Sequence, residues 1–413
     1  MTDFKNRDFR GKFKESDPIL EFQIPREEIQ GHRGSKGLIA IFGVMMTIDS
    51  TFMQRCLDLA YNGLGATAPN PMVGAVIVHD GKIIGEGFHT GLGKHHAEVE
   101  AVNQVLDQSI LPASTLYVNL EPCNHHGKTP PCTDLIFEKG IRKVVIGQYD
   151  SNQVAGGGVE RLRKNGIEVI TGVLEQECRF LNRRFNTFHE KKRPYLILKW
   201  AQTTDGFVDN LRIQEDQQKP SWITDEACRR LVHKWRSEEQ AIMAGSATIL
   251  HDNPQLNVRA WVGKNPVRIV IDRAARITGN KEQLSTGQKG DSFSPLKIVD
   301  GTAETIIYTC QENANHQNVK FIQISPIEPV WPQVLADLYN RNIQSVLIEG
   351  GPTLLSTLIE AGLFDEARVF IGPGWFGSGV KAPDFPFSPI EEEKIGNSRL
   401  LIFKAGELRS LIV

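Results

Sequence analysis

The sequence predicts an α/β protein built from two domains. Short apolar segments alternate with segments of helical periodicity, which is the pattern of a layered sheet covered by helices. A chain of 413 residues exceeds the usual size of one domain, so two domains are expected. The charged, proline-ended stretch 190–194 divides them. We expect a disordered extension over 1–48, a first domain over 49–190 and a second over 194–413.

Composition excludes several classes of protein. The formal net charge of −2 argues against a general nucleic-acid binder, which is usually strongly basic. Six cysteines scattered over a long chain do not form a secreted disulfide framework. The apolar run Leu38–Met46 is too short to cross a bilayer. We therefore expect a cytoplasmic protein that binds neither nucleic acid nor a membrane.

The first domain should open with a helix capped by Asp49 or Ser50. Asn70–Gly74 then leads into a β-hairpin, whose turn is His79–Lys82. Strands are expected over 75–78, 83–87, 115–120, 143–147 and 167–171, and helices over 96–106, 133–140, 159–165 and 173–188.

The most informative residues are His96, Glu98, Cys123 and Cys132. One imidazole and two thiolates suit Zn²⁺, and three protein ligands leave a fourth position open, as in catalytic zinc sites. Glu98 is placed to carry a proton from water to a leaving amine. A His-x-Glu element followed by Pro-Cys is typical of zinc nucleobase deaminases. Two residues separate the cysteines in that signature, whereas residues 124–131 separate them here.

Two other interpretations of these residues remain open. The cysteines could be two buried thiols beside a chance His-x-Glu element. Alternatively, His125 or His126 could complete a purely structural zinc site.

The second domain repeats the alternation of strand and helix. Strands are expected over 195–200, 241–245, 267–272, 305–309 and 345–348, and helices over 226–236, 246–250 and 330–340. Glu349–Leu355 reads as the end of a strand, a diglycine and a proline at the start of a helix. Such an arrangement can cradle phosphate, because the glycines permit close approach and the helix N-terminus favours an anion.

Together these motifs resemble the bifunctional deaminase–reductase family of bacterial riboflavin biosynthesis. The resemblance rests on Asn70–Gly74, His96–Glu98 and Glu121–Cys132 in the first domain. In the second it rests on Trp222–Thr224, Gly245–Thr248, Asp252–Pro254 and Glu349–Thr353. The family implies a three-layer, cytidine-deaminase-like domain followed by a dihydrofolate-reductase-like domain.

The resemblance implies a reaction for each domain. The first removes an amine from a diaminopyrimidinone that carries a ribosylamino 5′-phosphate, with His96, Cys123 and Cys132 binding Zn²⁺, Glu98 as the proton shuttle and Asn70 on the pyrimidine. The second uses NADPH to reduce the ribosyl group to a ribityl chain. We also expect a homo-oligomer. The alternative is a zinc deaminase whose second domain only binds substrate or assembles oligomers.

The resemblance also assigns residues of the reductase site. NADPH-binding positions are Ala201, Trp222, Thr248, Asp252, Arg273, Gly351, Pro352, Thr353, Leu354, Leu355, Ser356 and Thr357; Asp272 is an alternative to Arg273. Substrate-binding positions are Pro220, Arg236, Leu256, Arg259 and Glu349. The two arginines can grip phosphate bidentately. The family usually has a serine where this chain has Pro220, so a hydroxyl contact is missing there.

Overall fold

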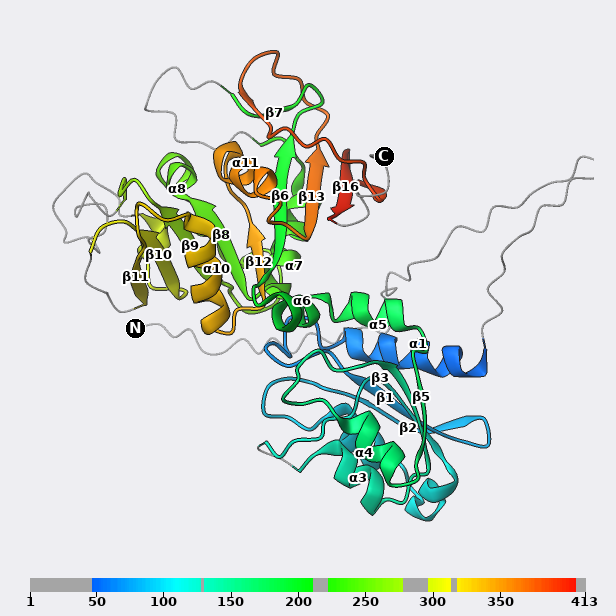
Figure 1. Ribbon diagram of the computed structural model, residues 1–413. Helices are drawn as coiled ribbons and strands as arrows, with labels where there is room; N and C mark the ends of the chain where they lie inside the picture. The colour runs from blue at the N-terminus through cyan, green and yellow to red at the C-terminus, as the bar shows by residue number, and fades with distance from the viewer. Residues whose placement is uncertain (1–46, 128–129, 211–221, 278–295, 313–317, 406–413) are drawn as a thin grey trace, which may run out of the picture. The chain divides into compact units, whose positions relative to one another are not determined.

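The computed structural model describes residues 47–127, 130–210, 222–277, 296–312 and 318–405 (Figure 1). These residues lie in one compact unit, which begins at Met46. The expected disordered extension lies outside the described residues up to position 46. The first helix starts earlier than expected, because Thr47 rather than Asp49 or Ser50 is its N-cap and accepts a 3.2 Å hydrogen bond from the Ser50 N–H.

Every strand expected in the first domain is present. The elements are α1 (Ile48–Tyr61), β1 (Gly74–His79), β2 (Lys82–Phe88), α2 (Ala97–Asn103), the 3₁₀ helix η1 (Gln108–Ala113), β3 (Thr115–Leu120), α3 (Cys132–Glu138), β4 (Lys143–Gln148), α4 (Gly158–Lys164), β5 (Glu168–Thr171), α5 (Glu175–Leu181) and α6 (Arg183–Lys191). The sheet order is β2-β1-β3-β4-β5. The β1–β2 and β1–β3 pairs are antiparallel, and the β3–β4 and β4–β5 pairs are parallel.

Helices cover both faces of this sheet, which gives three layers (Figure 1). Successive strand residues point to opposite faces, so Ile77 and Val118 pack against α2, α3 and α4. Their neighbours Val76 and Tyr117 pack against α1 and α5 instead. The layer with α2 and α3 holds the metal-ligand candidates.

The prediction of a single helix over 173–188 is wrong, because the chain forms two helices, α5 and α6, with a break at Asn182. Asn182 is buried, and its side chain hydrogen-bonds the Met72 backbone twice. It accepts from the N–H at 2.8 Å and donates to the C=O at 2.9 Å. The Asn182 backbone, with φ of −90° and ψ of 20°, leaves the helical region between α5 and α6. The break therefore fixes the segment that carries Asn70.

The second domain contains a larger sheet. Its elements are β6 (Tyr195–Gln202), β7 (Phe207–Asp209), α7 (Glu226–Glu238), β8 (Ala241–Gly245), α8 (Ser246–Asp252), β9 (Val267–Asp272), η2 (Lys297–Val299), β10 (Thr305–Thr309), β11 (Val319–Gln323), α10 (Val330–Asn340), β12 (Ser345–Ile348), α11 (Pro352–Glu360), β13 (Glu366–Ile371), β14 (Val380–Lys381), β15 (Glu391–Ile395) and β16 (Ser398–Lys404). The sheet order is β11-β10-β9-β8-β12-β6-β13-β16-β15, and β14 pairs separately with β7.

This sheet is parallel from β11 to β13, and only β16 and β15 run antiparallel to their neighbours. Apolar strand residues face α10 and α11 on one side and α7 and α8 on the other. The carboxyl ends of β6, β8, β9 and β12 therefore share one edge, which is where α/β sheets bind ligands.

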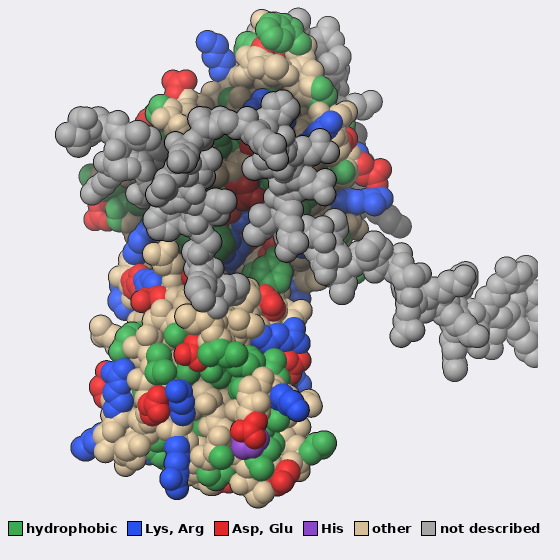
Figure 2. Space-filling view, turned by 90° about the vertical axis from the view of Figure 1, so that its right-hand side faces the viewer, with side chains coloured by type: hydrophobic (Ala, Val, Ile, Leu, Met, Phe, Trp, Pro, Cys, Tyr) green, Lys and Arg blue, Asp and Glu red, His purple; other side chains and the backbone are tan. Residues whose placement is uncertain are grey.

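No described helix is long and apolar enough to cross a bilayer. On the face drawn in Figure 2, acidic and basic side chains are interspersed, in keeping with the net charge of −2.

Candidate deaminase and reductase sites

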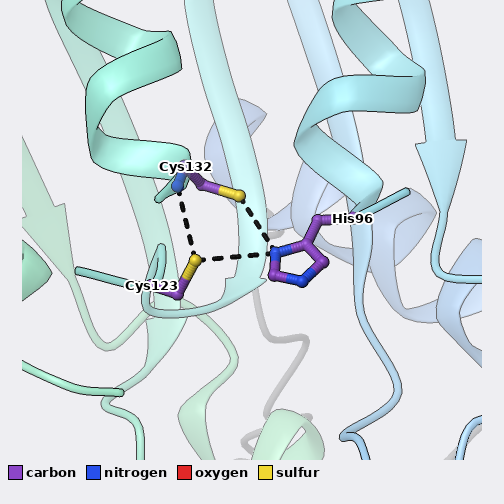
Figure 3. Close-up of side chains that lie close together, drawn as sticks. All are labelled: His96, Cys123 and Cys132. Atoms are coloured by element: carbon purple, nitrogen blue, oxygen red, sulfur yellow. Dashed lines mark hydrogen bonds between the residues drawn. The ribbon is translucent and has the colours of Figure 1, made fainter. Parts of the chain in front are cut away.

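His96, Cys123 and Cys132 converge from three elements (Figure 3). The Nδ1 atom of His96 lies 3.2 Å from the Cys132 Sγ and 3.5 Å from the Cys123 Sγ. Zinc bonds of about 2.1 Å to nitrogen and 2.3 Å to sulfur at a tetrahedral angle would separate these atoms by about 3.6 Å. The donor set and its spacing thus fit zinc. Neither His125 nor His126 joins the cluster within the part of the chain that the structure describes, which disfavours a closed structural site.

Backbone packing explains how residues distant in sequence meet. His96 is the N-cap of α2, Cys123 follows β3 after two residues, and Cys132 begins α3. The buried Glu121 carboxylate accepts hydrogen bonds from the N–H groups of Asp150 and Val159. Gly158 lies so close to this turn that a Cβ there would be 2.1 Å from the Pro122 carbonyl oxygen. The loop that carries Cys123 is therefore held against α4.

Glu98 lies beside these ligands in the first turn of α2. Its side chain is buried, and burial raises its pKa above the usual value. Hydrogen bonds from Cys132 and His96 lower the pKa of the Cys123 thiol to about 4, so this sulfur is ready to act as a thiolate. A carboxyl group that can both accept and release a proton thus faces a metal-ligand set.

His96, Cys123 and Glu98 line a pocket of about 450 Å³, whereas Cys132 is buried behind them. Asn70 lines it, as predicted, together with His89, Asp150 and Phe188. Asn342 and Gln344, from the turn before β12, line it as well, and Gln344 Nε2 donates to the Pro69 carbonyl at 2.7 Å. The presence of Asn342 and Gln344 in this pocket was not predicted. No local sequence pattern indicates that a residue will line a site formed mainly by a distant part of the chain.

In the second domain, Glu349 follows β12 and forms a buried ion cluster. Its carboxylate accepts from Arg236 Nε at 2.7 Å, from Arg236 Nη2 at 2.9 Å and from Lys199 Nζ at 3.4 Å. Burial opposes its ionisation, but the two cations outweigh burial and lower its pKa to about 2. Lys199 was not predicted; a lysine in the otherwise apolar strand 195–200 is the signal that could have identified it.

The two arginines predicted to bind phosphate differ in their contacts. Arg236 is held by Glu349, and its Nη1 donates to the Asn257 carbonyl at 3.1 Å. Arg259 has no carboxylate within ion-pair distance among the described residues, and its Nη1 lies 3.3 Å from Asn257 Oδ1. Arg259 is therefore the freer of the two for an anionic ligand.

Leu256, another predicted substrate-binding residue, is part of the core of the second domain. Leu256 has a buried side chain and a left-handed backbone, with φ of 50°. A left-handed conformation is costly for a bulky residue. Since the side chain packs in the core, a contact of Leu256 with a ligand would come from its backbone.

The predicted phosphate cradle forms at the N-terminus of α11. Gly351 is the N-cap, Pro352 is the first helical residue, and the Gly351 N–H donates to Thr248 Oγ1 at 3.1 Å. A Cβ on Gly350 would lie 2.5 Å from Leu354 Cδ2, so close packing requires glycine there. Helix N-termini present free N–H groups to phosphate. These residues fit a phosphate-bearing cofactor.

The remaining predicted cofactor positions lie on different elements of the second domain and differ in exposure. Ala201 is near the end of β6 and Asp252 ends α8. Trp222 is 63% exposed, with Arg229 over its ring. Arg273 follows β9, whereas Asp272 is buried and accepts from the Arg276 and Ile277 N–H groups.

Along α11 the predicted run contains one buried residue. Leu355 is buried in the core, so its side chain faces away from a ligand. Thr353 and Thr357 are exposed, and Ser356 is half-buried. Pro220 lies outside the described residues.

Comparisons with known proteins match both halves. Residues 46–148 match the cytidine and deoxycytidylate deaminase zinc-binding region, and residues 194–390 match the RibD C-terminal domain. Riboflavin biosynthesis protein RibD of Aquifex aeolicus is 38% identical over 371 residues, covering 86% of this chain and 98% of its own. RibD of Escherichia coli is 35% identical over 375 residues, covering 83% and 96%.

A solved structure is similar over the same extent. The diaminohydroxyphosphoribosylaminopyrimidine deaminase/5-amino-6-(5-phosphoribosylamino)uracil reductase from Thermotoga maritima has a TM-score of 0.75 at 38% identity. It covers 87% of this chain and 99% of its own. The likeness thus includes both domains.

Proposed function

Because this chain belongs to the RibD family of riboflavin biosynthesis, we propose that the two sites described above carry the two activities of that family. The protein is a bifunctional enzyme, a zinc-dependent deaminase and an NADPH-dependent reductase. The alternative of a non-catalytic second domain is thereby set aside. The proposed domains are 49–190 for deamination and 194–413 for reduction.

The substrate of the first site is proposed to be the phosphoribosylamino-diaminopyrimidinone that names the Thermotoga relative. His96, Cys123 and Cys132 would hold zinc, which when bound makes water available as a nucleophile at neutral pH. Glu98 takes the proton from the attacking water and returns it to the departing nitrogen. The carbon–nitrogen bond breaks, and ammonia leaves. Asn70 holds the pyrimidine ring.

The second site is proposed to reduce the deaminated product, converting its ribosyl group to a ribityl chain. NADPH supplies the hydride when bound, and water supplies the proton that completes the opening of the ribose ring. The N-terminus of α11 and Thr248 would hold the phosphates of the cofactor, and Arg259 the 5′-phosphate of the substrate. Glu349 keeps Arg236 and Lys199 in fixed positions, so that these cations are oriented before the substrate arrives. No general base is required of the protein.

One observation carries the deaminase assignment: three ligand atoms converge with a buried carboxyl group beside them and no fourth side-chain ligand among the described residues. Glu98→Gln in the full chain should retain zinc and lower ammonia release roughly 10²- to 10⁴-fold, because an amide cannot carry the proton. Glu100→Gln, on the same helix, is the matched control. Normal ammonia release by Glu98→Gln would overturn the role of Glu98.

NADPH oxidation should persist in Glu98→Gln when the deaminated compound is supplied. This second assay separates a chemical defect from misfolding, because a misfolded chain would lose both activities.

We further propose a cytoplasmic homo-oligomer. Light scattering on the purified chain tests the assembly, and a monomer at working concentration would contradict it.

A further inference from the structure

His89 is a buried residue of the deaminase pocket to which no catalytic or metal-binding role has been given. It follows β2 directly and is only 3% exposed. Its Nδ1 lies 2.9 Å from the His95 carbonyl oxygen, and its Nε2 lies 3.0 Å from the Asn70 Nδ2. Both ring nitrogens are therefore engaged, one by the backbone and the other by a predicted substrate-binding side chain.

The partners of His89 determine which of its nitrogens carries the proton. A carbonyl oxygen can only accept, so Nδ1 must be the protonated nitrogen. The structure places the Asn70 amide nitrogen against Nε2, and an amide nitrogen can only donate, so Nε2 must be the unprotonated nitrogen. The ring is therefore neutral, and Nε2 accepts the hydrogen bond from the Asn70 amide N–H.

The same pairing decides which atom of the Asn70 amide is left for a ligand. With Nδ2 donating to His89, Oδ1 is the atom left for a ligand, and no hydrogen bond to it is made within the described parts of the chain. A pocket that offered the amide N–H instead would select an acceptor on the pyrimidine. The identity of the presented atom therefore decides which ring edge binds.

We propose that His89 is a positioning residue, which fixes the Asn70 side chain so that its carbonyl oxygen receives an N–H donor of the pyrimidine. The inference rests on the proposed role of Asn70 in substrate binding. It adds the reason why that pocket prefers a pyrimidinone edge bearing N–H groups. A site built to accept from a substrate N–H discriminates against analogues that lack it.

Two substitutions separate the contacts of the two ring nitrogens. His89→Asn places an amide N–H near the position of Nδ1, so the bond to His95 can persist while the acceptor for Asn70 is lost. His89→Gln places a carbonyl oxygen near the position of Nε2 and can still accept from Asn70. In the full zinc-loaded chain, His89→Asn should lower kcat/KM for deamination roughly 10-fold, mainly by raising KM. His89→Gln should recover most of this loss.

A double-mutant cycle with Asn70→Ala tests whether His89 acts through Asn70. In the Asn70→Ala background, His89→Asn should cause little further loss, whereas independent effects would multiply. Nitrogen NMR of the wild-type ring should show the Nδ1–H tautomer. Multiplying effects, an Nε2–H ring or a His89→Gln enzyme as poor as His89→Asn would each overturn the inference.

Zinc content and NADPH oxidation are measured on every variant. The His89 and His96 rings pack edge to face, with centroids 5.7 Å apart. Loss of zinc in His89→Asn would therefore show that His89 supports the metal ligand rather than Asn70. Unchanged deamination in Asn70→Ala alone would instead refute the proposed substrate contact, and a defect in Asn70→Ala with normal His89 variants would refute only the positioning role.

Discussion

At the scale of single residues, the two sites use charge in opposite ways. In the deaminase pocket Glu98 is buried, and burial raises its pKa although the neighbouring His96 acts to lower it. In the reductase site Glu349 is also buried, but Arg236 and Lys199 keep it ionised. The same side-chain type thus has a raised pKa in one site, as the proposed role of Glu98 as proton carrier requires, and is a fixed anion in the other.

Arg259 provides a residue-scale test of the reductase site. Arg259→Ala should raise the KM of the reductase for its phosphorylated substrate roughly 10- to 100-fold, the usual cost of losing hydrogen bonds to a charged group. Steady-state NADPH oxidation measures it. Ammonia release should be unchanged, because Arg259 lies in the second domain. Arg230→Ala on exposed α7 surface is the control, and equal losses in both activities would instead indicate misfolding.

At the scale of elements, helix starts and breaks position the chemistry. His96 is the N-cap of α2, and Cys132 is the first residue of α3. The starts of these two short helices therefore fix the positions of both ligand candidates. Asn182, at the break between α5 and α6, fixes the chain just after Asn70 through Met72. Asn182 therefore helps to position the segment that carries Asn70, the proposed substrate contact.

Asn182→Ala tests this element-scale role. The change removes two buried hydrogen bonds and leaves the Met72 N–H unpaired, so the free energy of unfolding should fall by about 2–3 kcal/mol. Denaturant unfolding with a deaminase-domain probe measures the loss. Asn62→Ala removes hydrogen bonds at an exposed helix end and should cost less. Equal stability of Asn182→Ala and wild type would show that the Asn182–Met72 contact contributes nothing.

At the scale of the whole molecule, buried ion pairs make folding depend on pH. Glu366 accepts from Arg368 Nε at 2.6 Å and from the Tyr195 hydroxyl at 3.0 Å. Burial opposes its ionisation, yet Arg368, Arg183 and Arg184 lower its pKa from 4.5 to about 2. A carboxyl group with a lowered pKa contributes stability that is present above its unfolded pKa and is lost as pH falls through the folded value.

The free energy of unfolding should therefore fall between about pH 4.5 and pH 2. Glu366 alone contributes on the order of 3 kcal/mol to this change. Glu366→Gln should be less stable at pH 7 and should lose part of the acid dependence, as followed by denaturant unfolding at several pH values. Glu392→Gln, which alters an exposed ion pair with Arg399, should leave the profile unchanged. An unaltered profile in Glu366→Gln would contradict this account.

Most of the elements near the sites were predictable because their signals are local. The strands 267–272, 305–309 and 345–348 and the helix 330–340 have the predicted bounds. The C-terminal strands β13 to β16 were not predicted. The acidic run in β15 has little alternation of apolar and polar residues, and β15 is exposed at the sheet edge, so its strand conformation depends on pairing with β16 rather than on its own pattern.

The sequence by itself indicated the family and the two activities through its resemblance to known enzymes. The spacing and residue types of His96, Glu98, Cys123 and Cys132 indicated the candidate zinc site. Only the tertiary structure decided which side chains hold the other residues around the two sites in place. His89 on Asn70, Asn182 on Met72 and Lys199 on Glu349 join residues far apart in sequence or without a motif. Such contacts depend on how the elements pack, and packing is decided by the folded chain as a whole rather than by any local pattern.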